Sequence, residues 1–101
     1  MSNTIWVAVS VIESIESGEY LGRISRSDLD ALETNERTTG FVKLEQVGWI
    51  DSDSATGIHW LSKTEDKDIG DYGYGDIAYL RIERISRIIP LKQEFVKRFL
   101  N

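Results

Sequence analysis

The side chains best suited to chemistry are concentrated between Asp76 and Leu91, where arginines stand three residues apart. Guanidinium groups beside aromatic rings offer charge and stacking surface, which is what a nucleotide or another small anion needs. The opposing interpretation is that these arginines pair with carboxylates elsewhere in an acidic chain. Both interpretations stay open at this stage. The candidate ligand or partner contacts are Arg81, Arg84, Arg87, Trp60 and Tyr79.

A second candidate is the glycine- and tyrosine-rich approach to this stretch, residues 70–75. Its glycines make the backbone permissive, and Tyr72 and Tyr74 supply rigid amphipathic contact area. The segment is either a loop that contacts a partner or gates a ligand, or merely a packed connection. Its glycine spacing does not match a phosphate-binding loop.

Catalytic and metal-binding patterns are weak. The chain has no cysteine and one histidine, His59, which argues against a catalytic zinc site. The loop that begins Asp51-Ser52-Asp53 starts like a calcium loop but has Thr56 at the sixth position and Ser62 at the twelfth, and Asp66-Lys67-Asp68 fails similarly. No serine lies in a nucleophile elbow. We therefore expect a non-enzymatic protein with no cofactor and no metal.

Length and composition indicate one soluble domain, residues 1–101. Apolar residues make up 41% of the chain and charged residues 29%, which is ordinary for a globular protein. The N-terminus lacks a basic leader and a cleavage site, so a signal peptide is not expected. No apolar run reaches the length of a membrane span. The expected location is the cytoplasm.

Alternation of apolar side chains predicts several short strands. Thr4–Ile12 has two largely apolar faces, as in a central strand covered on each side, and a turn at residues 16–19 should lead into a paired strand, Tyr20–Ser25. Gly22 marks a bulge or a close approach. In Phe41–Ile50 the parity places Val47 with Phe41 and Trp49, opposite Val42 and Leu44. A further strand is expected at Ile58–Lys63.

The arginine-rich stretch itself reads as two strands, about Asp76–Ile82 and Ile85–Ile89, joined at a kink at Glu83-Arg84. In one unbroken strand, Leu80 and Ile82 would face away from Ile85 and Ile89, and a bulge or tight bend repairs this. A helix is the competing interpretation, because the apolar residues also follow a 4-3-4 spacing.

Helix is expected in two places. Ser27 is a candidate N-cap for a short helix over Asp28–Leu32, and Lys92–Leu100 should form a terminal helix with Phe95 and Phe99 on its apolar face. The predicted fold is therefore mainly β (α+β): a small antiparallel barrel or strongly bent sheet of about six short strands, with one short internal helix and a C-terminal helix.

The net charge of −5 is unevenly distributed. Residues 1–76 contain 6 basic and 15 acidic residues, a balance of −9, whereas residues 77–101 contain 6 basic and 2 acidic residues, a balance of +4. With no credible catalytic set, the favoured function is an acidic protein-interaction module, an adaptor or inhibitor that docks on a partner protein. The alternative is a binder of a small anionic ligand. Unpaired sheet edges also suggest a homo-oligomer, most simply a homodimer.

The acidic body leads to a first prediction about nucleic acid. We expect no micromolar or tighter binding to random-sequence duplex DNA at physiological salt, because the acidic part repels phosphate and salt screens charges beyond about 8 Å. Fluorescence anisotropy of a labelled duplex measures this. A dissociation constant of about 1 μM or lower would contradict it.

Overall fold

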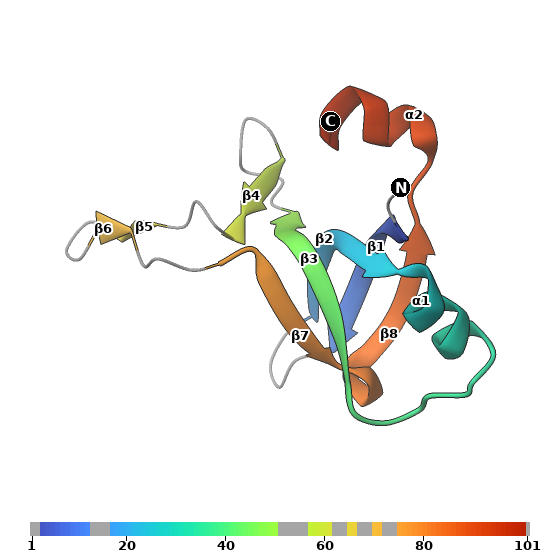
Figure 1. The fold of residues 1–101 in the computed structure, drawn as a ribbon. Coiled ribbons are helices and arrows are strands. Elements are labelled where there is room, and N and C mark those ends of the chain that lie inside the picture. The colour runs from blue at the N-terminus through green and yellow to red at the C-terminus, as the bar shows by residue number, and fades with distance from the viewer. Residues whose placement is uncertain are drawn as a thin grey trace.

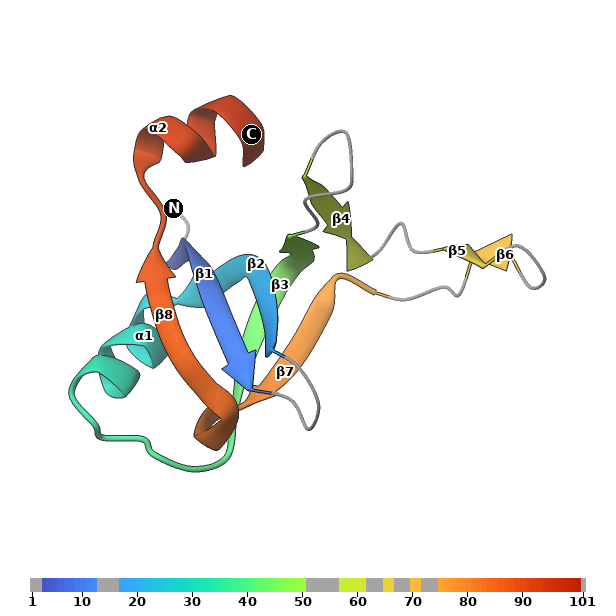
Figure 2. The ribbon, with the colours of Figure 1, turned by 180° about the vertical axis from the view of Figure 1, so that it is seen from behind.

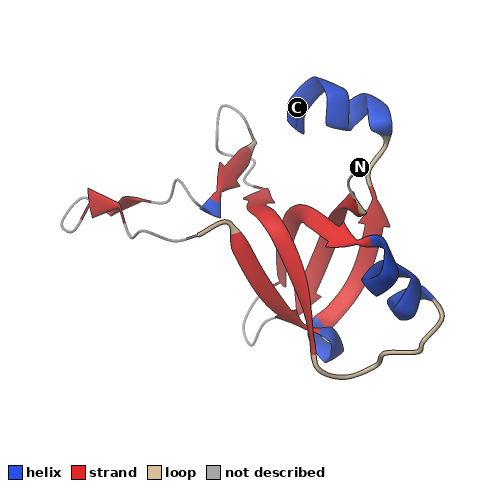
Figure 3. Ribbon diagram, viewed as in Figure 1, coloured by secondary structure: helices blue, strands red, loops and turns tan. Residues whose placement is uncertain are grey.

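The computed structural model describes residues 3–12, 17–50, 57–61, 65–66, 70–71 and 75–100, and it is mainly β, as predicted (Figure 1). Short helical segments flank the main sheet (Figure 3). They are α1 (Arg26–Glu33), the 3-10 helix η2 (Ile82–Arg84), α2 (Gln93–Phe95) and the π-helical η3 (Val96–Leu100). The main sheet holds six antiparallel strands: β1 (Thr4–Ile12), β2 (Ser17–Ser25), β3 (Phe41–Ile50), β4 (Ile58–Trp60), β7 (Ile77–Arg81) and β8 (Ile85–Pro90). Two further short strands, β5 (Glu65–Asp66) and β6 (Gly70–Asp71), pair with each other.

The main sheet is curled. Its strand order is β4–β3–β2–β1–β8, and β7 pairs with β3. β7 and β8 therefore lie toward opposite ends of the sheet, although only η2 separates them in the chain. The two strands meet at η2 in both views (Figures 1 and 2), so the sheet must bend. No ladder joins β7 to β8 among the described residues, so the sheet is not closed into a barrel and that part of the prediction is not confirmed.

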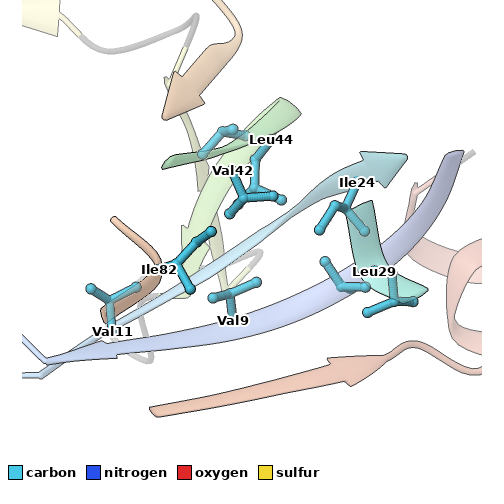
Figure 4. Packing of buried hydrophobic residues seen from close by; sticks show 9 residues of the cluster. Val9, Val11, Ile24, Leu29, Val42, Leu44 and Ile82 are labelled. Carbon is cyan, nitrogen blue, oxygen red and sulfur yellow. The ribbon is translucent and has the colours of Figure 1, made fainter. Parts of the chain in front are cut away.

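The hydrophobic core fills the concave face of this curled sheet (Figure 4). β1, β2, β3, α1 and η2 all contribute to it, so residues far apart in the chain share one apolar interior. Burial of this kind contributes about 1.5–3 kcal/mol for each large aliphatic side chain. The buried members of the cluster are Val7, Val9, Val11, Ile24, Leu29, Val42, Leu44, Val47 and Ile82.

The arginine-rich stretch forms two strands, as predicted, and the helical interpretation is wrong. The expected kink is the 3-10 turn η2, whose Ile82 enters the core. One detail differs from the prediction. The pairing of β8 with β1 shifts register between Val11 opposite Ile85 and Ser10 opposite Arg87. This bulge turns Ile88 toward the core and leaves Ile89 43% exposed.

β3 also changes phase, at Gln46, which has a positive φ of 51°. In the ladder with β2, Leu21 pairs with Gly48 and Arg23 with Glu45, so β3 holds one extra residue there. The prediction that Val47 lies opposite Val42 and Leu44 is therefore wrong, because the bulge turns all three into the core. Gly22 faces the bulge, and a Cβ on it would lie 3.2 Å from the Glu45 carbonyl oxygen. This confirms the predicted close approach.

β1 is a central strand, between β2 and β8, but its outer face is only partly covered. Trp6 is half-buried there and Ile12 is 52% exposed. Trp6 meets Trp60 of β4 edge to face, with ring centroids 6.3 Å apart. Trp60 also lies over Gly48, where an added Cβ would approach its ring to 2.9 Å. Leu21, paired with Gly48, is 1% exposed.

The helices differ in detail from expectation. The N-cap of α1 is Ser25, not Ser27: its Oγ accepts a hydrogen bond of 3.1 Å from the Asp28 N–H. In the C-terminal segment, Phe95 and Phe99 stack on each other at 4.9 Å but are exposed, and Val96 is the buried residue. The described helices are all too short to cross a membrane. The predicted strand Ile58–Lys63 is shorter than expected, and Ser62 and Lys63 lie outside the described residues.

The position of the N-cap can be tested with two serines. We expect Ser25→Ala to lower the free energy of unfolding by about 1 kcal/mol, because the Asp28 N–H loses its acceptor. Ser27→Ala removes only an exposed contact with Ser25 and should cost less than about 0.5 kcal/mol. Urea denaturation of both variants measures the difference. Equal losses would show that Ser25 is not the cap.

Candidate functional site

The three predicted arginines lie on three different elements. The Arg81 guanidinium on β7 lies over the Phe41 ring of β3, 5.6 Å from its centroid. Arg84 is exposed on η2. On β8, an Arg87 Nη2 lies 3.5 Å from the Ser10 Oγ. Arg81 and Arg87 thus contact different strands, Arg84 lies on the turn between β7 and β8, and their joint action on one ligand stays a prediction.

The predicted aromatic contacts are also separated. Tyr79 is 66% exposed and lies on the outer face of β7. Trp60 is half-buried against Trp6. Tyr72 and Tyr74 lie outside the described residues, as does most of the loop that begins at Asp51.

Tyr79 belongs to a row of outward-facing residues that we call the β3–β7 face. The ladder pairs Phe41 with Arg81, Lys43 with Tyr79, and Glu45 with Ile77. The alternate residues Val42 and Leu44 are buried, so this second set points away from the core. The face is defined by Phe41, Lys43, Glu45, Ile77, Tyr79 and Arg81.

Three of the six residues of this face are aromatic or aliphatic, and all three are exposed. Phe41, Ile77 and Tyr79 are 53%, 44% and 66% exposed, and they come from two adjacent strands. Lys43 and Glu45 form an ion pair of 3.4 Å, so they largely cancel each other's charge. Arg81 leaves one positive charge at the Phe41 end. Contiguous apolar surface of this kind marks a contact site more often than scattered single residues do.

β7 offers a second means of contact beside this face. One of its edges pairs with β3, and among the described residues no strand pairs with the other. Unpaired backbone groups on an edge can accept an additional strand. Sequence reasoning identified Tyr79 and Arg81 but not Phe41 and Ile77. The sequence shows that Phe41 and Val42 lie on opposite faces of the strand. Parity alone does not show which of the two faces the core.

A cavity of about 440 Å³ lies between the C-terminal helical segment and the adjoining parts of β1, β2 and the β3 bulge. Its polar wall includes Arg23, Arg26 and Gln46, and its apolar wall includes Trp6 and Val96. An Arg23 Nη1 donates a hydrogen bond of 2.8 Å to the Gln46 Oε1. Sequence reasoning did not identify this site, because its residues come from six separate elements.

A second cavity, of about 340 Å³, lies between the segment after α1 and strand β8. Arg37 and Arg87 both line it. Arg37 is already engaged, since its Nη1 lies 3.0 Å from the Asp28 Oδ1 and its Nη2 donates to the Phe41 carbonyl oxygen. The positive charge of Arg37 is therefore already balanced by Asp28.

The remaining candidates for chemistry are the histidine and the charged side chains of the described ranges. His59 is exposed and stacks on Trp49, with centroids 5.5 Å apart and planes 15° apart. The described residues hold no group of three metal-ligating side chains and no buried charged side chain. No protein-family model, curated protein or solved structure matches the chain. Functional inference therefore depends on the surface geometry.

Two arginine variants test how far these side chains support the fold. We expect Arg81→Gln to lower the free energy of unfolding by about 0.5–1 kcal/mol, because it removes the exposed cation–π contact with Phe41. Arg84→Gln, on the exposed turn, should change it by less than about 0.5 kcal/mol. Chemical denaturation measures both. A loss well above these values for Arg84→Gln would assign it a structural role.

Proposed function

We propose that this protein is a non-enzymatic interaction module that docks on a basic partner protein through the β3–β7 face. The observation that carries the proposal is the contiguous exposure of Phe41, Ile77 and Tyr79 on two paired strands. Aromatic and arginine side chains are enriched among residues that dominate binding energy at protein interfaces. The face offers both kinds, with Arg81 held over Phe41.

The rigidity of this face supports docking. Its backbone belongs to a ladder of five residue pairs, from Phe41–Arg81 to Glu45–Ile77. The inward-facing residues of both strands, such as Val42 and Leu80, pack in or against the core and hold the backbone in place. Binding would therefore restrict only the exposed side chains of the face. A preorganised surface loses less conformational entropy on association and therefore binds more tightly for the same contacts.

The charge of the whole chain indicates the kind of partner. A net charge of −5 attracts a positively charged protein at long range and accelerates the encounter. The face itself carries one net positive charge, that of Arg81, because Lys43 and Glu45 pair, so the long-range attraction comes from the rest of the chain. We therefore expect a basic partner whose contact surface is itself apolar, with association that slows as salt rises.

The test compares three immobilised forms of the full chain in extracts of the source cells. One is the unmodified protein, one carries Phe41→Ser with Tyr79→Ser, and one carries Ile89→Ser. Ile89 is a matched control, since it is 43% exposed but lies on β8 at the other end of the sheet. The recovered partner is then purified, and its affinity for each form is measured by calorimetry at two salt concentrations.

We expect a basic partner to bind the unmodified and Ile89→Ser forms equally and the double variant at least about tenfold more weakly. Equal binding by all three forms would remove the β3–β7 face as the site, and recovery of no stoichiometric partner would contradict the proposal. Sedimentation of the same samples tests a second copy as the occupant. A homodimer that dissociates only in the double variant would replace the partner protein with self-association.

A further inference from the structure

We propose that the cavity beside the C-terminal helical segment binds a small phosphate monoester with an apolar or aromatic body. The site is independent of the docking proposal, because none of the residues of the β3–β7 face lines it. Its volume of about 440 Å³ lies within the range of about 300–1,000 Å³ found for small-molecule sites.

The electrostatics of the cavity are opposite to those of the chain. Arg23 and Arg26 line it, and no acidic residue is among its described lining residues. This contrasts with the 17 acidic and 12 basic residues of the whole sequence. The helical segment that forms one wall is also basic. It contains or adjoins three basic residues, Lys92, Lys97 and Arg98, and one acidic residue, Glu94. A local positive potential inside an acidic molecule favours an anion at this place.

The polar wall is held in place before any ligand arrives. Arg23 is fixed by its hydrogen bond of 2.8 Å to Gln46, and Gln46 is itself held at the β3 bulge with a φ of 51°. A non-glycine residue in this region costs conformational energy, and such positions recur at binding sites. The backbone of Arg26 is anchored as well, because its N–H donates 2.7 Å to the Asn3 carbonyl oxygen.

The apolar wall is also anchored. The Leu91 N–H donates a hydrogen bond of 2.9 Å to the Trp6 carbonyl oxygen, which ties the start of the helical segment to β1. Val96 is buried beside it, and Trp6 lines the same cavity. The cavity thus has a cationic side and an apolar side that includes an aromatic residue.

This pairing indicates the class of ligand. A phosphate monoester offers more acceptor oxygens than a carboxylate to the N–H donors of the two arginines that line the cavity. Guanidinium also binds phosphate oxygens in a bidentate geometry. Trp6 and the aliphatic residues then receive the body of the ligand, for which a nucleoside is a suitable probe.

The experiment is an NMR titration of the full ¹⁵N-labelled chain with AMP, adenosine, phenyl phosphate and inorganic phosphate. Indole N–H signals of the three tryptophans and arginine Nε–H signals are followed. Trp49 is an internal control, because it stacks on His59 and does not line the cavity. Arg26→Gln tests the cationic wall, and Arg84→Gln is the matched control for loss of one exposed arginine.

We expect AMP to shift the Trp6, Arg23 and Arg26 signals and leave Trp49 unchanged, with adenosine at least about tenfold weaker. Arg26→Gln should weaken the binding of AMP about tenfold, which corresponds to about 1.4 kcal/mol. Arg84→Gln should leave the affinity for AMP unchanged. The proposal is overturned if no phosphate probe shifts Arg23 and Arg26, or if Arg84→Gln weakens binding as much as Arg26→Gln. Leu100→Trp, which fills the cavity from its apolar wall, provides a second variant that should abolish the Trp6 shift without removing charge.

Discussion

The structure depends on one constraint: a single curled sheet must present all its core side chains on its concave face. Regular alternation cannot satisfy this along strands that bend and change partners. Three local changes of phase satisfy it, at Gln46 in β3, at Ser86 in β8 and at η2 between β7 and β8. Each restores the inward direction of the apolar residues that follow it. Without them, Val47 and Ile88 would point away from the interior.

Within the described part of the chain, no second layer covers the whole convex face. Trp60 lies over Gly48 and meets Trp6, and Leu21, the partner of Gly48 in the ladder, is 1% exposed. On the part built from β3 and β7, Phe41 and Tyr79 are exposed. The same arrangement that completes the core thus leaves an apolar surface free for a partner.

The bulge at Gln46 connects the fold to the cavity. It turns Val47 into the core, and the Gln46 side chain then holds Arg23 at the cavity wall. The energy stored in its left-handed backbone is offset by the burial that the phase change permits. The cavity and the β3–β7 face share no residue and present different chemistry. Arginines line the cavity, whereas aromatic and aliphatic side chains are exposed on the face.

Local patterns in the sequence determined the β class, the strands Thr4–Ile12 and Phe41–Ile50, and the division of the arginine-rich stretch into two strands, because alternation and turn residues act over a few positions. They could not orient Val47 or choose between Ile88 and Ile89, since a bulge depends on the strand that lies alongside. They also assigned the N-cap of α1 to Ser27, two residues after the observed cap, Ser25. Only the tertiary structure brought Arg23, Arg26 and Trp6 to one cavity and exposed Phe41 beside Tyr79. Those neighbours are set by ladders between distant segments, and no local spacing records such pairings.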